Sequence, residues 1–191
     1  MNVTLIGLPG AGKTAQAAIL SQSNGAAFIS NRNLVREAMC SHTALAQQAQ
    51  EAISSGWLIP DHVLVGLLEQ TLVNEAIGRD YILSGLPRSV PQAQAVHDML
   101  SRIERPLDLA MFFDMSFDMM VDRLSVAATH IQSDIGSRLS TLKINYDNFL
   151  SATEPLLRFY DKLGKACRID ADLSAAQVSV QIAAALAAAS P

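Results

Sequence analysis

Short runs of apolar residues alternate with longer amphipathic segments along the whole chain. The apolar runs predict five short strands, at residues 3–6, 26–30, 81–83, 109–113 and 166–169. The clearest of the intervening helices are predicted at 14–23, 92–102, 117–124, 139–163 and in the C-terminal segment. Three further helical segments are predicted between residues 33 and 73, with breaks near His42 and at Gly56–Pro60. Strands separated by helices predict a parallel sheet with right-handed crossovers, and hence an α/β fold.

The composition describes one domain with little charge. The 191 residues are 50% hydrophobic but only 5% aromatic, and 17% are charged, against roughly 25% in an average soluble domain. Lys and Arg number 14 against 18 Asp and Glu, which gives a formal net charge of −4. Such a chain has no basic surface with which to cover a nucleic-acid backbone or an anionic membrane. We therefore expect neither nucleic acid nor membrane as a partner.

The cysteines and the two ends of the chain point to the cytoplasm. Cys40 and Cys167 lie far apart and match no zinc or disulfide pattern, which suits a reducing compartment. The first ten residues lack the basic head and long apolar stretch of a signal peptide. The uncharged run from Leu173 to Pro191 is interrupted by Ser and Gln and is a poor membrane span. We expect a cytoplasmic protein that is a monomer.

A glycine-rich segment directly follows the first predicted strand. Residues 7–14 read Gly-Leu-Pro-Gly-Ala-Gly-Lys-Thr, which satisfies G-x-x-x-x-G-K-[ST] between a strand and a helix. Glycines let consecutive backbone N–H groups turn toward phosphate oxygens, and the helix N-terminus adds the positive end of its dipole. Lys13 places a cation on the β- and γ-phosphates, and Thr14 offers a hydroxyl toward Mg²⁺. The predicted ATP-binding residues are Gly7, Pro9, Gly10, Ala11, Gly12, Lys13 and Thr14.

Further motifs resemble those of the adenylate kinases and other nucleoside-monophosphate kinases, and they occur in the same order. Besides Pro9 and Gln16 at the loop, they are Ser30–Arg36, Gly56–Asp61, Ser84–Arg88 with Gln92, Asp122–Leu124, and Thr153–Leu156 with Tyr160. The resemblance covers essentially the whole chain. It implies a P-loop NTPase-type parallel five-stranded sheet flanked by helices. It also implies a core of residues 1–30, 61–124 and 136–191, a small helical acceptor-binding insertion at about 31–60, and a short lid at about 125–135.

The resemblance also implies an acceptor site. Arg36 and Arg88 correspond to arginines that bind the acceptor monophosphate, a task that suits planar guanidinium groups. Gln92 corresponds to the glutamine that reads the acceptor adenine, because its amide can donate and accept at once. Asn31, Ile59 and Gly85 are expected to line the same pocket. Trp57, the sole tryptophan, is expected to pack under the helices of the insertion rather than to stack on a base.

The same resemblance implies which residues are catalytic. Arg123 corresponds to an arginine that reaches the transferring phosphoryl group from the lid side, where a cation stabilises charge in the transition state. The predicted catalytic residues are thus Lys13, Arg88 and Arg123.

Near the acceptor site the chain departs from the family pattern at two positions. Ser84 replaces the aspartate that helps to hold hydrated Mg²⁺, so that a hydroxyl remains but the negative charge is lost. Thr14 and Ser84, through water, are the predicted metal contacts. Arg32 replaces a glycine and adds bulk and positive charge beside the acceptor pocket.

The lid side departs further. Ala127 and Asn145 stand where the family has arginines, and Arg138 and Lys143 are the cations nearest to those positions. A missing transition-state cation can cost a factor of about 10³ or more in related phosphoryl transfers. Whether Arg138 or Lys143 replaces a missing arginine stays open at this point.

Three functions remain, in order of preference. The first is an ATP-dependent kinase that uses Mg²⁺ and moves the γ-phosphoryl group of ATP to a nucleoside monophosphate, with AMP as the expected acceptor. The second is a degenerate nucleotide-binding member with weak or no kinase activity, suggested by Ser84 and the missing lid arginines. The third is a kinase for another phosphorylated small molecule, suggested by Arg32.

Overall fold

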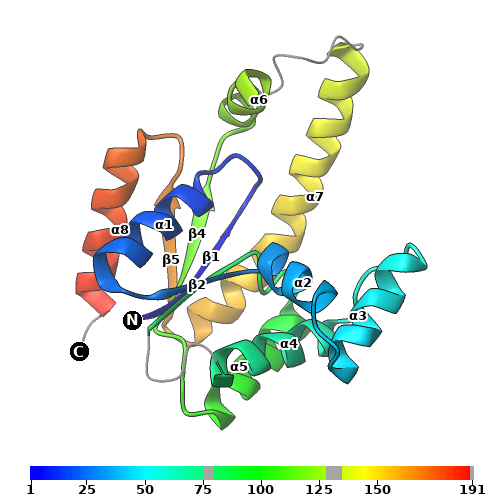
Figure 1. Ribbon diagram of the computed structural model, residues 1–191. Coiled ribbons are helices and arrows are strands. Elements are labelled where there is room, and N and C mark those ends of the chain that lie inside the picture. Colours follow the sequence, from blue (N-terminus) through cyan, green and yellow to red (C-terminus); the bar gives the residue numbers. More distant parts are fainter. Residues whose placement is uncertain (75–79, 128–134, 190–191) are drawn as a thin grey trace.

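Five parallel strands form one sheet at the centre of the molecule (Figure 1). The computed structural model describes residues 1–74, 80–127 and 135–189. The strands are β1 (Asn2–Gly7), β2 (Ala27–Ser30), β3 (Tyr81–Ser84), β4 (Leu109–Asp114) and β5 (Ala166–Asp170), and they lie in the order β2-β3-β1-β4-β5. Every neighbouring pair is parallel. The predicted α/β fold with a five-stranded parallel sheet is therefore confirmed.

Helices connect the strands as the sequence pattern predicts. They are α1 (Lys13–Asn24), α2 (Asn31–Met39), α3 (Ala44–Ser54), α4 (Asp61–Asn74), α5 (Val90–Arg102), α6 (Phe117–Ala127), α7 (Ile135–Lys162) and α8 (Ala175–Ala189). Hydroxyl side chains cap several N-termini: the N–H of Asn33 donates to Ser30 at 3.1 Å, and the N–H of Gln92 donates to Ser89 at 3.3 Å. Helix α7 begins four residues earlier than the apolar pattern indicated.

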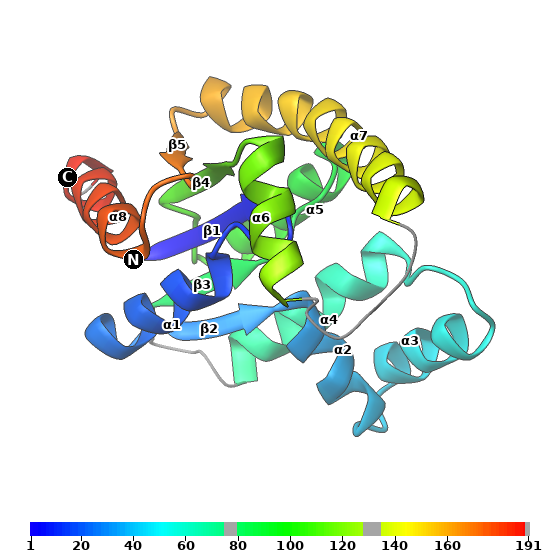
Figure 2. The same ribbon diagram turned by 90° about the horizontal axis from the view of Figure 1, so that it is seen from above.

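The sheet is buried on both faces, as parallel sheets are. Consecutive residues alternate between two apolar cores: Leu5 packs on the side of α1 and α8, and Ile6 packs on the side of α4, α5 and α7. Phe112 and Phe113 on β4 divide between the same two cores. Figure 2 shows the helices covering the two faces, with α1 and α8 on one side. This aliphatic core agrees with the low aromatic content.

Helices α2 and α3 lie beside the sheet, in the segment predicted as an acceptor-binding insertion (Figure 1). They share a small separate core with α4, made of Ala38, Ala46, Ala49, Val63 and Leu67. Trp57, in the loop between α3 and α4, is 76% exposed, and the neighbouring Leu58 is 93% exposed. The expectation that Trp57 packs under these helices is wrong, because the small Ala-rich core between them is filled by other side chains. The division into core, insertion and lid stays a prediction.

The carboxyl ends of the central strands bring three loops together. The loop of residues 8–12 follows β1, the segment 85–89 follows β3, and Met115–Ser116 follows β4. In open parallel sheets the crevice at this edge is where ligands bind. Thr4 on β1 donates from its buried hydroxyl to the carbonyl oxygen of Leu86 at 2.5 Å, which holds the second loop against the first strand. None of the helices in the described part of the chain has the length and apolarity that a membrane span needs.

Candidate active site

The phosphate-binding loop joins β1 to α1 in a conformation that requires glycine. Gly10 and Gly12 have φ angles of 87° and 83°, in the left-handed region that other residues rarely adopt. Gly7 is needed for a different reason: a Cβ atom added there lies only 2.8 Å from the Cβ of Phe113 on β4. The glycines of the sequence motif are therefore required, two of them by backbone conformation and one by packing.

Lys13, the first residue of α1, folds back onto this loop. Its Nζ donates to the carbonyl oxygens of Gly7 at 2.6 Å and Leu8 at 2.7 Å. Burial of the ammonium group, together with the positive charge of Arg88, lowers the pKa of Lys13 to about 8. The repulsion from Arg88 means that the loop after β1 and the loop after β3 bring their cations close to each other.

Arg123, on α6, contacts the outer side of the same loop. Its guanidinium group donates to the carbonyl oxygen of Gly10 at 3.2 Å and to that of Leu173 at 3.3 Å, and it lies 3.8 Å from the sulfur of Met115. Leu173 belongs to the segment between β5 and α8. Arg123 thus joins the loop after β1 to the segment before α8.

Two of the predicted acceptor residues, Arg88 and Gln92, are hydrogen-bonded to each other through the backbone of Arg88. The Nε of Arg88 donates to the carbonyl oxygen of Gly85 at 2.9 Å, and its backbone N–H donates to the Oε1 of Gln92 at 2.7 Å. The Nε2 of Gln92 donates in turn to the Oδ1 of Asp61 at 2.7 Å. Gln92 is only 2% exposed. Asp61 was missing from the predicted site, although it ends the motif Gly56–Asp61 and so carried a signal in the sequence.

The remaining acceptor residues lie on the same edge of the sheet. A Cβ added at Gly85, whose φ is 81°, approaches the Cβ of Asn31 and the Nη2 of Arg88 at 3.7 Å each. The Oδ1 of Asn31 is buried and accepts no hydrogen bond from the residues that the structure describes. Ile59 is half-buried and packs against two of the apolar cores.

The arginines of α2 stand apart from these residues. Arg36 and Arg32 are both exposed. The structure brings Arg88, Gln92, Gly85 and Asn31 together at the end of β3, whereas Arg36 and Arg32 lie exposed on α2.

Two hydroxyl groups are the candidates for contact with a metal ion. Thr14 is exposed at the start of α1, and Ser84 is 8% exposed at the end of β3, next to Leu5 and Ser30 in the sheet register. Within the described ranges, no three His, Cys, Asp or Glu side chains group as metal ligands. This donor set fits a hydrated Mg²⁺ that arrives with ATP phosphates, since hydroxyls bond metal-bound water but add no charge. It does not fit a tightly held resident ion.

The lid side is described only in part. Residues 128–134 and the side chains of Ala127 and Arg138 lie outside the described residues. Asn145 is exposed on α7. Lys143 pairs with Asp147 at 3.0 Å, and its Nζ lies 5.2 Å above the ring of Phe117 and 5.0 Å above that of Tyr146. Lys143 is thus held at the contact between α6 and α7.

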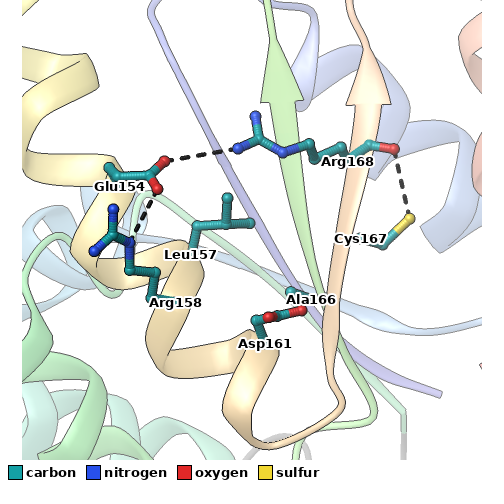
Figure 3. Close-up of a pocket in the computed structure, with 7 residues that line it drawn as sticks. All are labelled: Glu154, Leu157, Arg158, Asp161, Ala166, Cys167 and Arg168. Atoms are coloured by element: carbon teal, nitrogen blue, oxygen red, sulfur yellow. Dashed lines mark hydrogen bonds and ion pairs between the residues drawn. The ribbon is translucent and has the colours of Figure 1, made fainter.

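The structure also contains a cavity of about 360 Å³ between α7 and the edge strand β5 (Figure 3). It is lined by Glu154, Leu157, Arg158, Asp161, Ala166, Cys167 and Arg168. Glu154 pairs with Arg158 at 3.1 Å and lies 3.7 Å from Arg168, so the charges at this cavity neutralise one another. None of the predicted site residues lines it. The candidate site is therefore the crevice at the strand ends and not this cavity.

Comparison with known proteins agrees with the geometry at the strand ends. Residues 5–165 match the family described as "Adenylate kinase". The chain belongs to the adenylate kinase family. It is 32% identical over 186 residues to "Adenylate kinase" of Xanthomonas campestris pv. campestris (strain B100), which covers 97% of this chain and 99% of that protein. It is 30% identical over 186 residues to "Adenylate kinase" of Stenotrophomonas maltophilia (strain R551-3), with the same coverage. A third relative, "Adenylate kinase" of Prochlorococcus marinus (strain MIT 9301), is 30% identical over 181 residues, 95% of this chain and 96% of that protein.

Proposed function

We propose that this member of the adenylate kinase family transfers the γ-phosphoryl group of ATP to AMP and so forms two molecules of ADP. One observation carries the proposal. The phosphate loop after β1 and the acceptor segment after β3 meet at one edge of the sheet, where Thr4 of β1 donates to the carbonyl oxygen of Leu86 at 2.5 Å, and burial together with the charge of Arg88 lowers the pKa of Lys13. An enzyme that transfers phosphoryl groups must hold donor and acceptor side by side, and the mutual repulsion of the two cations is relieved when anionic phosphates arrive.

The residues divide the work between donor and acceptor. Phosphates of ATP lie on the loop Gly7–Thr14, and Lys13 exchanges its backbone carbonyl partners for the β- and γ-phosphate oxygens. Arg88 and Arg36 bind the phosphate of AMP, with Asn31, Ile59 and Gly85 around it and Gln92 at the adenine. An oxygen of the AMP phosphate then attacks the γ-phosphorus, and the bond to the β–γ bridging oxygen of ATP breaks.

Charge in the transition state is stabilised by cations on both sides. Lys13 and Arg88 face the transferring group from the loop and from the acceptor segment, and Arg123 contributes once it leaves Gly10 and Leu173. Mg²⁺, when it is bound with ATP, would neutralise further charge. The hydroxyl groups of Thr14 and Ser84 would contact it directly or through water. Closure of the segments at about 31–60 and 125–135 excludes water from the crevice.

The proposal also names the partners and the compartment. ATP and AMP are its small-molecule partners, and it acts as a monomer in the cytoplasm, where the free thiols of Cys40 and Cys167 stay reduced. Nucleic acid and membranes are not among the proposed partners, given the net charge of −4.

A coupled assay with ATP, Mg²⁺ and a panel of nucleoside monophosphates tests the proposal. We expect turnover with AMP to exceed turnover with the other monophosphates. If folded protein, checked by circular dichroism, turns over none of them, the proposed kinase function is wrong.

Ser84 and Asn145 favour one second candidate, a member that binds nucleotides but transfers phosphoryl groups slowly or not at all. Calorimetry with ATP and AMP separates the two functions. Binding of both without turnover supports the second candidate, and turnover at ordinary kinase rates, about 1–100 per second, rules it out.

A further inference from the structure

The side-chain amide of Gln92 is held at both ends by groups that allow only one orientation. Its Oε1 accepts the backbone N–H of Arg88 at 2.7 Å, and its Nε2 donates to the Oδ1 of Asp61 at 2.7 Å. A backbone N–H can only donate, and a carboxylate can only accept. Rotation of the amide by 180° places its carbonyl oxygen against the carboxylate and its NH₂ group against the N–H. Gln92 is 2% exposed, so water cannot compensate for the two lost bonds.

We infer that Asp61 determines which acceptor base Gln92 accepts. The inference rests on the proposed function, because it assigns a role within the same acceptor site. Asp61 is a positioning residue: its carboxylate orients the amide of Gln92, and the oriented amide selects a base with a 6-amino group over one with a 6-oxo group.

The chemistry of the two kinds of purine explains this selection. After its two bonds within the protein, the amide of Gln92 keeps one N–H donor and one oxygen lone pair. Adenine presents an acceptor at N1 and a donor at its 6-amino group, whereas hypoxanthine presents a donor at N1–H and an acceptor at its 6-oxo oxygen. The donor and acceptor positions are therefore reversed between the two bases, and one fixed amide matches only one of them. A glutamine that is free to flip matches either base.

The position of Asp61 suits this role. It is the first residue of α4, where the helix N-terminus favours a negative charge. The loop before it carries Ile59, which packs against the main core and the insertion core, so the carboxylate is held by the same segment that lines the acceptor pocket. The bond from Gln92 crosses from α5 to α4 and joins residues 31 positions apart. The carboxylate of Asp61 therefore fixes the amide of Gln92 relative to the segment that lines the acceptor pocket.

The variant Asp61→Asn tests the inference. An asparagine can accept from the NH₂ of Gln92 or donate to its oxygen, so it keeps a hydrogen bond in both orientations and removes the constraint. The chain offers a matched control on α5. Asp98 accepts from Gln94 at 2.8 Å in the same kind of bond, but on the exposed surface. The measurement is the calorimetric dissociation constant for AMP and for inosine monophosphate, whose base is hypoxanthine, with wild type, Asp61→Asn and Asp98→Asn.

We expect the wild-type protein to bind AMP at least about 100-fold more tightly than inosine monophosphate, because a site built around a fixed hydrogen bond rejects the wrong partner strongly. We expect Asp61→Asn to lower this ratio of dissociation constants about tenfold, because a hydrogen bond to a charged group contributes about that much to binding. We expect Asp98→Asn to leave the ratio unchanged. If Asp61→Asn does not fold, Asp61→Ser replaces it, and the wild-type ratio is measured in either case.

The outcomes separate this inference from the proposed function. A wild-type protein that binds AMP and turns it over, but shows the same ratio in Asp61→Asn, overturns the inference and leaves the kinase function intact. A wild-type ratio near one also overturns it. A wild-type protein that binds neither monophosphate overturns both the inference and the proposed acceptor.

Discussion

The donor and acceptor sides of the site hold their polar side chains in different ways. On the donor side, Lys13 and Arg123 donate to backbone carbonyl oxygens, those of Gly7, Leu8, Gly10 and Leu173. On the acceptor side, the guanidinium of Arg88 also donates to a carbonyl oxygen, that of Gly85, whereas the amide of Gln92 is held by the carboxylate of Asp61 and the backbone N–H of Arg88. Carbonyl oxygens are neutral, so the anionic oxygens of a phosphate attract the same cations more strongly and can replace them.

In the proposed mechanism this difference separates cations that exchange carbonyl partners for phosphate oxygens from an amide that is already oriented. Lys13 is the first of these cations, and Gln92 is the amide. The base-reading part of the acceptor side is then pre-organised in this proposal. Four experiments test this contrast between the two sides.

The largest effect is expected from Lys13→Met. Methionine keeps the length of the side chain but removes the cation, and we expect kcat to fall about 10³-fold, as for other single cations in phosphoryl transfer. The unfolding midpoint should change little, because two lost hydrogen bonds are offset by removal of a partly buried charge. Lys162→Met, at the exposed end of α7, is the control for steady-state kinetics and thermal unfolding. A loss of less than tenfold contradicts the role assigned to Lys13.

The acceptor side is tested by Arg88→Lys. Lysine keeps the charge but loses the planar fork and the bond from Nε to Gly85. We expect KM for AMP to rise about 100-fold while KM for ATP changes less than threefold, since the loss of one charged contact costs about 3 kcal/mol. Arg102→Lys, in an exposed ion pair with Glu69, should leave both constants unchanged. An equal rise in both constants indicates that Arg88 serves the two substrates alike.

The pKa of Lys13 predicts a pH dependence for ATP binding. In the free protein this pKa is about 8, below its usual value of 10.5, because of burial and Arg88. Bound phosphates favour the protonated form and raise the pKa, so binding takes up a proton. Affinity is therefore complete below pH 8 and falls, about tenfold per unit, as the pH rises above 8.

Calorimetry at several pH values between 7 and 9.5 measures this dependence, and buffers of different ionisation enthalpy report the proton uptake. The variant Lys13→Met should lack the dependence. Constant affinity across this range in the wild-type protein shows that Lys13 keeps its charge without phosphate.

The smallest effect is expected from Lys143→Met. Its ammonium group is engaged by Asp147 and lies over two aromatic rings, so we expect it to stay at the contact between α6 and α7 and kcat to fall less than threefold. The assay is the same steady-state measurement, and Lys162→Met again serves for comparison. A loss of 100-fold or more identifies Lys143 as the substitute for a missing lid arginine.

The fold was predictable from the sequence because its signals are local. Apolar runs such as residues 3–6 and 109–113 need burial on both faces, and only a covered parallel sheet supplies it. The glycines of the loop were equally readable, since left-handed φ angles at Gly10 and Gly12 exclude most other residues. The prediction for Trp57 was wrong because apolar character favours burial only where space remains, and the core of the insertion is filled by alanines, Val63 and Leu67.

The site could be predicted residue by residue but not in its connections. The family resemblance pointed to Gln92 and Arg88. The partner of the Gln92 side chain, Asp61, is 31 positions away, and no spacing in the sequence predicts that hydrogen bond. The placement of Arg123 against Leu173 depends likewise on a segment 50 positions later. Such contacts arise from the packing of whole helices, and a motif cannot encode them.

The shortage of positive charge was visible from the sequence alone, and so were the few places where cations remain beside a phosphate-binding loop. Hydrophobic periodicity and backbone stereochemistry act within a few residues, so they determine strands, helices and the loop without reference to the rest of the chain. What each polar side chain contacts was set by the tertiary fold: Lys13, Arg123 and Arg88 donate to backbone carbonyl oxygens, whereas the amide of Gln92 is held between the carboxylate of Asp61 and the backbone N–H of Arg88. The physical reason is that hydrogen bonds and pKa values depend on distances of a few ångströms between side chains far apart in the sequence, and folding alone sets those distances.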